Sequence, residues 1–244
     1  MSGDIAKNPY TEEHCMKKLV IIPAYNECAS ILNAVDDIRR HAPEFDYVVI
    51  NDCSTDETLD ICQKNGLNHI NLSVNLGIGG AVQTGYIYAC QQGYDTAVQF
   101  DGDGQHDATY LEMMAQKLVE TDSGMVIGSR FIEKEGFQSS GLRRVGIWYF
   151  SQLIRLLSGK KVTDPTSGLR MVNKDVMRIY AGNYPKDYPE PESVMAILRM
   201  GKKVTEVPVI MRERKEGTSS IGGLRTVYYM IKVTLAILVE RLRK

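Results

Sequence analysis

The sequence reads LVIIP at residues 19–23 and YVVI at residues 47–50, with a helical stretch from about 29 to 41 between them. Short β-rich apolar runs on either side of a helix predict a β-α-β unit. The same alternation continues with expected helices at 55–65 and 81–92 and expected strands at 69–72, 96–100 and 125–127. Strands that alternate with helices predict an α/β fold with a mostly parallel central sheet flanked by helices.

Length and composition fit one soluble globular domain. The chain has 244 residues, of which 43% are hydrophobic and 24% charged, so a largely disordered or polytopic membrane protein is not expected. It carries 29 basic and 30 acidic residues, a net charge of −1. A nucleic-acid partner is therefore not expected, because nucleic-acid binding domains are strongly basic.

Cysteine usage and the chain start indicate a cytoplasmic protein. The five cysteines contain no CxxC pair and form an odd set, which is typical of reduced thiols and not of a disulfide framework. Residues 1–17 are polar and are expected to form a disordered tail, without the apolar core of a signal peptide. No apolar run reaches the roughly 18 residues that a membrane span needs.

The last fifth of the chain is basic. From Arg199 onward there are 11 Lys or Arg residues and 4 Glu, a local charge of +7. Residues 223–244 are predicted to form an amphipathic basic helix around the apolar segment TVYYMIKVTLAILV at 226–239. Two interpretations are equally supported: a helix that lies on an anionic membrane surface, or one that packs on the core or in a homo-oligomer.

Polar residues follow three of the expected strands directly. PAYNE occupies 23–27, NDCS occupies 51–54 and DGDGQH occupies 101–106. Ligands of open α/β sheets bind beyond the carboxyl ends of the strands, so these segments should meet at one edge. We expect a donor-binding half before about residue 130 and an acceptor-facing half after it.

The DGD turn is the strongest single indication of a catalytic or metal-binding site. Asp101 and Asp103 flank Gly102, which permits close backbone approach. Two carboxylates with this spacing suit Mg²⁺ or Mn²⁺, which would in turn neutralise a diphosphate leaving group. The structural alternative is a solvated acidic turn, and the neighbouring His106 is equally interpretable as a metal ligand or as a brace for the turn.

Two further segments suggest nucleotide contacts. Asp52 is suited to accept a hydrogen bond from a base N–H, whereas the residues at 54–56 are explained by capping of the next helix. The Gly-rich segment NLGIGGA at 75–81, which includes Gly80, is interpretable either as a phosphate loop or as a tight turn into a helix.

Six motifs in order resemble one known family. They are PAYNE (23–27), NDCSTDET (51–58), NLGIGGAVQTG (75–85), DGDGQH (101–106), GSR (128–130) and DPTSGLR (164–170). Together they resemble family-2 inverting glycosyltransferases of the GT-A fold, in particular the dolichol-phosphate (polyprenol-phosphate) mannosyltransferase-like branch. The resemblance covers residues 17–222 and implies one Rossmann-like GT-A domain over 18–222, followed by the basic helix.

The resemblance implies roles for individual residues. The nucleotide would be surrounded by Pro23, Tyr25, Glu27 and Asp52, with Asp101 and Asp103 holding the metal and diphosphate. Gly80 of the Gly-rich segment and Gly102 of the DGD turn are further nucleotide-binding candidates. The resemblance also assigns Gln105 to the metal site and Arg214 and Ser219 to a phosphate. Further candidates for the acceptor or its phosphate are Gln105 as well as Arg130, Arg144 and Arg170, and the Arg143-Arg144 pair is otherwise interpretable as solvated surface charge. Three positions depart from the family pattern: Asn51 and Cys53 stand where Asp and Gly are usual, and Ser220 replaces a frequent Lys.

A hydroxyl acceptor would need a general base, and Glu192 is the leading candidate. It lies nine residues before Gly201, a spacing that matches the family Glu, in a Pro-rich context that restricts the backbone. Glu190 and Asp164 are the other catalytic candidates besides Asp103. The structural alternative for both glutamates is favourable charge at a helix start.

These observations predict a metal-dependent inverting glycosyltransferase that uses a nucleotide-sugar, with a UDP, GDP or dTDP carrier. The favoured acceptor is a hydroxyl of a lipid-linked glycan in cell-surface polysaccharide synthesis, and the alternative is a polyprenyl phosphate. The enzyme is expected at the inner face of the cell membrane. A nucleotidyltransferase is disfavoured because PAYNE lacks a basic Gly-rich loop, and an inactive binding module is disfavoured because both aspartates are intact.

Overall fold

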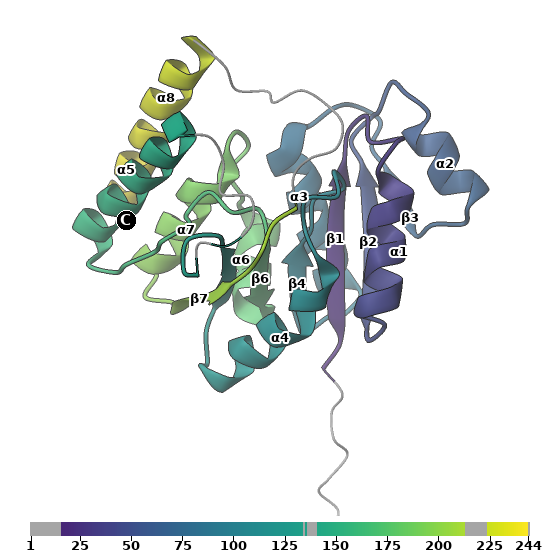
Figure 1. The fold of residues 1–244 in the computed structure, drawn as a ribbon, viewed down its shortest axis with the longest axis horizontal. Helices are drawn as coiled ribbons and strands as arrows, with labels where there is room; N and C mark the ends of the chain where they lie inside the picture. Colours follow the sequence, from purple (N-terminus) through teal and green to yellow (C-terminus); the bar gives the residue numbers. More distant parts are fainter. Residues whose placement is uncertain (1–15, 134, 136–140, 213–223, 244) are drawn as a thin grey trace, which may run out of the picture.

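A seven-stranded sheet with the order β3-β2-β1-β4-β6-β5-β7 forms the centre of the molecule in a computed structural model (Figure 1). The structure describes residues 16–133, 135, 141–212 and 224–243. The strands are β1 (Lys18–Ala24), β2 (Phe45–Asn51), β3 (His69–Asn71), β4 (Thr96–Gln99), β5 (Met125–Ser129), β6 (Arg170–Asn173) and β7 (Val204–Pro208).

Helices follow most of the strands in the chain. They are α1 (Ile31–His41), α2 (Thr58–Lys64), α3 (Gly77–Gln91), η1 (Ala108–Tyr110), α4 (Leu111–Glu120), α5 (Gly141–Ser158), α6 (Lys174–Gly182), α7 (Pro189–Arg199) and α8 (Leu224–Leu242). The predicted α/β fold with a mostly parallel sheet is therefore confirmed. The Gly-rich segment differs from the expectation of a turn before residue 81, because α3 already begins at Gly77.

The sheet separates two apolar layers. Alternate residues of β1 face opposite sides: Leu19 and Ile21 pack in one layer with α3, α6 and α7, and Val20 and Ile22 pack in the other with α1 and α4. Because both faces of β1 are covered, its sequence after Lys18 is continuously apolar and does not alternate with polar residues.

One strand runs against the others. β6 is antiparallel to both β4 and β5, whereas β1, β2, β3 and β4 are parallel neighbours and β5 is parallel to β7. Sequence analysis did not predict this strand. Its first residue, Arg170, pairs with Gln99 at the end of β4. The segment before β6 is thereby brought to the same sheet edge as the DGD turn.

The C-terminal helix α8 packs on the fold along one stripe. Val233, Ile237 and Glu240 are buried against the rest of the molecule, and α8 contacts α5 and α7 (Figure 1). Its other side is exposed. None of the helices in the described part of the chain is both long and apolar enough to span a membrane.

Candidate active site

The ends of three parallel strands bring the predicted segments together. Ala24 at the end of β1 is in register with Asn51 at the end of β2, and the backbone N–H of Phe100 after β4 donates to the carbonyl of Ile21. The segments that follow these strands therefore share one edge of the sheet, as the motif positions predicted. We describe this edge as the candidate active site.

Asp52 is buried where β2 meets the start of α3. Its Oδ1 accepts a hydrogen bond from the backbone N–H of Leu76 at 2.7 Å, and its own N–H donates to the carbonyl of Ala24 at 2.9 Å. The side-chain amide of Asn75 donates to the carbonyl of Asp52. These bonds fix the carboxylate at the sheet edge before any ligand arrives.

The two unusual residues beside Asp52 have structural explanations. Asn51 donates to Asn71 and accepts from Ser54, so its amide links two strand ends and the following turn. Cys53 has φ +56°, in the left-handed region where glycine is unstrained. Glycine would adopt this conformation without strain, whereas Cys53 adopts it with strain.

The PAYNE segment caps α1 and leaves one ring at the surface. The carbonyl of Glu27 accepts from the N–H groups of Ser30 and Ile31, and the N–H of Glu27 donates to Thr58 Oγ1 at 2.9 Å. Pro23 lies within β1. Tyr25 is 48% exposed, so its ring is accessible to a planar ligand at the edge.

The glycines of the first turn of α3 serve close packing. A Cβ on Gly79 would lie 2.1 Å from the carbonyl oxygen of Pro185, and one on Gly80 would lie 2.4 Å from the Cβ of Leu76. Tight packing therefore explains both glycines, and the phosphate-binding role of Gly80 stays a prediction.

His106 braces the DGD turn. It is buried, and its Nδ1 accepts from the backbone N–H of Asp101 at 2.9 Å. A neutral ring with Nδ1 as acceptor carries its proton on Nε2, which lies 3.6 Å from Asp101 Oδ2. Asp103 accepts from the N–H of Gln105 at 3.0 Å. Of the two interpretations of His106, the geometry favours the brace.

The two aspartates fit a divalent cation that also binds a ligand. In the described chain, no three His, Cys, Asp or Glu side chains gather into a metal-binding group. Asp101 and Asp103 are partly exposed and supply hard oxygen donors. Mg²⁺ is commonly bound in this way, by one or two carboxylates with water and substrate phosphates completing the shell.

Arg130 and Asp164, predicted as phosphate-binding and catalytic residues, pair with each other. Two nitrogens of Arg130 contact the two oxygens of Asp164 at 2.7 and 2.8 Å, and Asp164 is fully buried. Burial opposes the charge of Arg130, but the bonds to Asp164 outweigh it and raise the pKa of the guanidinium. The N–H of Asp164 also donates to Glu206. The geometry thus indicates a structural pair.

Arg170 is buried inside the fold. Its guanidinium donates to the carbonyls of Pro165, Ser167 and Glu190 and to the hydroxyl of Ser193. These bonds join the DPTSG loop to the first turn of α7, away from the surface where an acceptor phosphate would arrive. The loop in turn touches the metal-site candidate, because a Cβ on Gly168 would lie 2.7 Å from Asp101 Oδ2.

The two candidate base residues on α7 face different neighbours. Burial raises the pKa of Glu190, Arg170 works against that shift and the charge of Asp101 adds to it. Burial also raises the pKa of Glu192, and the next contribution comes from Glu240 of α8. The charges that act on Glu190 therefore include Asp101 of the DGD turn, whereas the first charge that acts on Glu192 is Glu240 of α8.

The remaining acceptor-site candidates are spread out. Gln105 is partly buried and its carbonyl accepts from the N–H of Arg212 at 2.9 Å, while Arg144 is exposed on α5. Arg214 and Ser219 lie outside the described residues. Arg212, which sequence analysis did not single out, also contacts Asp107 at 2.8 Å, so the chain after β7 runs directly beside the DGD turn.

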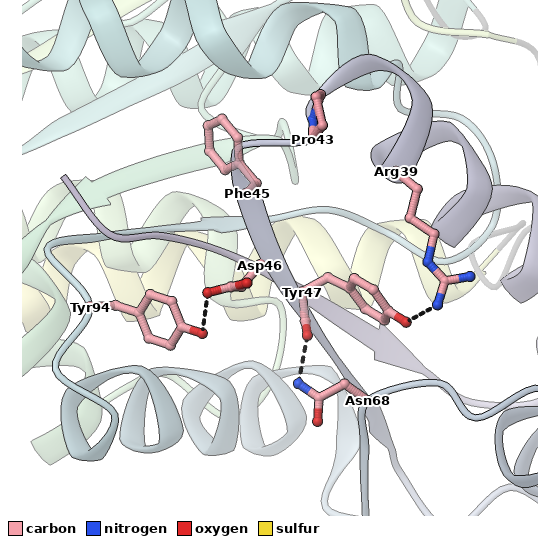
Figure 2. Close-up of a pocket in the computed structure, with 7 residues that line it drawn as sticks. All are labelled: Arg39, Pro43, Phe45, Asp46, Tyr47, Asn68 and Tyr94. Carbon is pink, nitrogen blue, oxygen red and sulfur yellow. Dashed lines mark hydrogen bonds between the residues drawn. The ribbon is translucent and has the colours of Figure 1, made fainter. Parts of the chain in front are cut away.

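A pocket of about 350 Å³ lies elsewhere, at the opposite end of β2 (Figure 2). Phe45 at the start of the strand lines it, whereas Asp52 follows the strand's end. Its polar groups bond to one another: Tyr94 donates to Asp46, and Arg39 donates to the hydroxyl of Tyr47 (Figure 2). This pocket is therefore separate from the candidate active site.

Comparison with known proteins identifies the family. Residues 19–180 match the family described as Glycosyl transferase family 2, and the chain belongs to this family. It is 30% identical over 219 residues to an undecaprenyl-phosphate mannosyltransferase of Micrococcus luteus, a match that covers 85% of this chain and 88% of the relative. A UDP-N-acetylglucosamine–dolichyl-phosphate N-acetylglucosaminyltransferase of Methanococcus voltae is 29% identical, covering 88% and 95%.

Solved structures share the fold. The Mycobacterium tuberculosis glucosyl-3-phosphoglycerate synthase in complex with Mn²⁺ and UDP-glucose superimposes with a TM-score of 0.69, at 18% identity over 93% of this chain and 79% of that one. The Pyrobaculum calidifontis mannosyltransferase PcManGT with GDP-mannose and Mn²⁺ gives a TM-score of 0.66, at 16% identity over 93% and 64%. The protein is thus a glycosyltransferase with a GT-A fold.

Proposed function

We propose that this glycosyltransferase moves a sugar, with inversion, from a nucleotide-sugar to a polyprenyl phosphate at a membrane surface. The observation that carries the proposal is the meeting of Asp52 with Asp101 and Asp103 at one sheet edge. The chain is also similar over most of its length to two transferases that are named for lipid-phosphate acceptors. Their names support the phosphate acceptor over the hydroxyl that the sequence motifs favoured.

The donor is proposed to bind at the strand ends. Asp52 accepts a hydrogen bond from the base, and Tyr25 offers an exposed ring for stacking on it. Asp101 and Asp103 hold Mg²⁺ or Mn²⁺ against the diphosphate. When bound, the cation neutralises charge that develops on the departing nucleoside diphosphate. We propose this donor half to extend to about residue 130.

The acceptor phosphate attacks the anomeric carbon from the face opposite the diphosphate. The new carbon–oxygen bond forms as the bond to the diphosphate breaks, and the nucleoside diphosphate leaves with the electron pair. A phosphate is already anionic at pH 7, so no side chain must remove a proton. Basic side chains position it instead, and Arg143 and Arg144 at the start of α5 are exposed for that purpose, with Arg214 and Ser219 as further candidates.

A hydroxyl acceptor on a lipid-linked glycan is the second candidate, and Glu190 is the observation that favours it. A carboxyl with a raised pKa beside the reacting centre suits proton abstraction. Under the phosphate-acceptor proposal, Glu190 instead accepts hydrogen bonds from hydroxyls of the transferred sugar. The two roles differ in how much activity Glu190→Gln removes.

Two adjacent helices provide a surface for the membrane. We call this surface, formed by the exposed sides of α5 and α8, the membrane face (Figure 1). Its most exposed apolar residues are Val145, Trp148, Leu156, Val227, Tyr228, Ile231, Leu235, Val239 and Leu242. Exposed basic residues accompany them: Arg143, Arg144, Arg155, Arg241 and Arg243. Apolar surface with a basic surround suits the headgroup region of anionic lipid, and we propose the cytoplasmic leaflet as its location.

Vesicle binding tests the membrane face. Changing Ile231 and Leu235, each 57% exposed, to Glu should lower partition onto vesicles that contain anionic lipid by at least about tenfold. The matched control is Val119→Glu, a 64% exposed apolar position on α4. Equal vesicle binding by all three proteins would contradict the membrane face and leave α8 as a helix for packing or self-association.

Product analysis tests the acceptor. The purified protein is given Mn²⁺, a panel of UDP-, GDP- and dTDP-sugars, and either a polyprenyl phosphate or a lipid-linked glycan. Mass spectrometry should find one sugar added to the polyprenyl phosphate, with release of the matching nucleoside diphosphate. Transfer only to the glycan hydroxyl would overturn the phosphate acceptor in favour of the second candidate.

A further inference from the structure

Aromatic rings connect the C-terminal helix to the loop before α7. The ring of Tyr229 on α8 lies edge-on to the ring of Tyr188, with centroids 4.7 Å apart and planes at 81°. On its other side it contacts Phe150 of α5, at 5.7 Å and 87°. Lys232, one turn further along α8, bonds to Asp187 at 2.6 Å. Helix α8 therefore contacts residues 187–188 through an aromatic ring and an ion pair.

Tyr188, which Tyr229 contacts, has an unfavourable backbone conformation. Tyr188 has φ +51° and ψ +55°, the left-handed conformation that only glycine adopts without strain. It also precedes Pro189, and residues before proline favour extended conformations. Such a conformation persists only where surrounding contacts impose it. Tyr229 is the aromatic side chain of α8 that packs on the Tyr188 ring.

The strained turn determines where α7 begins and therefore where Glu190 lies. Pro189 is the first residue of α7 and Glu190 the second. The carbonyl of Glu190 accepts from the buried guanidinium of Arg170. Arg170 also holds the loop whose Gly168 lies against Asp101. A change in the turn at Tyr188 would shift Glu190 relative to the DGD turn.

We propose that Tyr229 is a positioning residue for sugar transfer: by packing on Tyr188 it holds the left-handed turn that places Glu190 beside the DGD turn. The inference rests on the proposed function. It gives α8 a second task besides membrane contact, because the buried side of the helix shapes the active site. Burial raises the pKa of Tyr229, and the charge of Glu190 raises it further.

A short-chain, water-soluble prenyl phosphate separates this task from membrane binding. With that acceptor and no vesicles, Tyr229→Leu should lower kcat about tenfold and change the donor KM by less than about twofold. The matched control is Tyr88→Leu, a partly buried tyrosine on α3, which should retain wild-type kcat. Circular dichroism confirms that each variant is folded.

A rescue variant distinguishes positioning from general loss of packing. Glycine adopts the left-handed conformation without help, so adding Tyr188→Gly to Tyr229→Leu should restore several-fold of the lost kcat. The inference would be overturned if Tyr229→Leu kept the wild-type kcat, or if adding Tyr188→Gly did not restore part of the lost kcat. In either case, transfer by the wild-type protein would leave the proposed function intact. Absence of transfer by the wild-type protein would overturn the proposed function and this inference with it.

Discussion

The two halves of the candidate active site, the proposed donor side and the proposed acceptor side, are held in different ways. On the donor side, Asp52 and Asp101 follow strands whose backbones are fixed by ladder hydrogen bonds on the inside of the sheet. On the acceptor side, the DPTSG loop and the start of α7 are held by buried charged side chains, Arg170 and the Arg130–Asp164 pair. The backbone hydrogen bonds of a sheet remain when a side chain is removed. A loop that is held by one guanidinium loses its support when that side chain is removed. Substitutions on the donor side should therefore remove activity, and those on the acceptor side should also remove stability.

The largest expected effect on the donor side is loss of turnover without loss of fold. Asp103→Asn removes the charge of a proposed metal ligand from a partly exposed turn, so sugar transfer should fall by about a thousandfold or more. Its free energy of unfolding should change by about 0.5 kcal/mol or less. Nucleotide release measures sugar transfer, and urea unfolding measures the free energy of unfolding. Asp60→Asn on the exposed side of α2 is the control, and full activity of Asp103→Asn in EDTA would contradict the prediction.

On the acceptor side, Asp164→Asn should cost stability. It leaves the guanidinium of Arg130 largely buried without its partner, which typically costs about 3–5 kcal/mol. The matched change is Asp175→Asn, which breaks the exposed contact with Lys202 and should leave the free energy of unfolding nearly unchanged. Urea unfolding of both variants decides the point. Equal free energies of unfolding for Asp164→Asn and Asp175→Asn would contradict the proposed difference in stability between the donor and acceptor sides.

The glutamates on α7 sharpen the comparison within the acceptor side. With a phosphate acceptor, Glu190→Gln should lower transfer by about tenfold through lost sugar contacts, and Glu192→Gln should retain near wild-type transfer. A loss of about 10²–10⁴-fold in Glu190→Gln would indicate a general base and thus a hydroxyl acceptor. If only Glu192→Gln is impaired, the placement of Glu190 as the active-site carboxyl is wrong.

The smallest expected effect is on the pH dependence of stability. Burial and Glu240 raise the pKa of Glu192 above its usual value of 4.5, so the folded protein binds this proton more tightly than the unfolded chain. The stabilisation is complete below pH 4.5 and is lost as pH rises through the folded pKa. Glu192→Gln should therefore flatten this decline in the free energy of unfolding. Parallel pH profiles for variant and wild type would show that Glu192 is not desolvated.

Sequence analysis located the donor-side residues because a parallel sheet leaves them little freedom. Once PAYNE, NDCS and DGDGQH are assigned to strand ends, their meeting at one edge follows from topology. It ranked Glu192 ahead of Glu190 as the general base, whereas the charge of the DGD turn acts on Glu190 and that of α8 acts on Glu192. Two residues apart on a helix lie about 200° apart around its axis, so which one faces the active site depends on where α7 begins and what it packs against.

The burial of these charged side chains could not be predicted from the sequence for a related reason. Arg130 and Asp164 lie 34 residues apart, and each resembles a ligand-binding residue when considered alone. Arg170 was also assigned to the acceptor, because the antiparallel strand β6 that buries it was not predicted. Four residues, RMVN, carry too little periodicity to indicate a strand or its direction.

The central claim is that the two carboxylates after β4 hold a divalent cation together with the donor diphosphate. Electron paramagnetic resonance of Mn²⁺ measures this directly, because the signal of free Mn²⁺ falls when the ion is bound by protein. Titration of wild-type protein with Mn²⁺ and a nucleoside diphosphate should show one bound ion per chain, and Asp103→Asn should weaken that binding by at least about tenfold. Equal Mn²⁺ binding by wild-type and Asp103→Asn proteins would contradict the account.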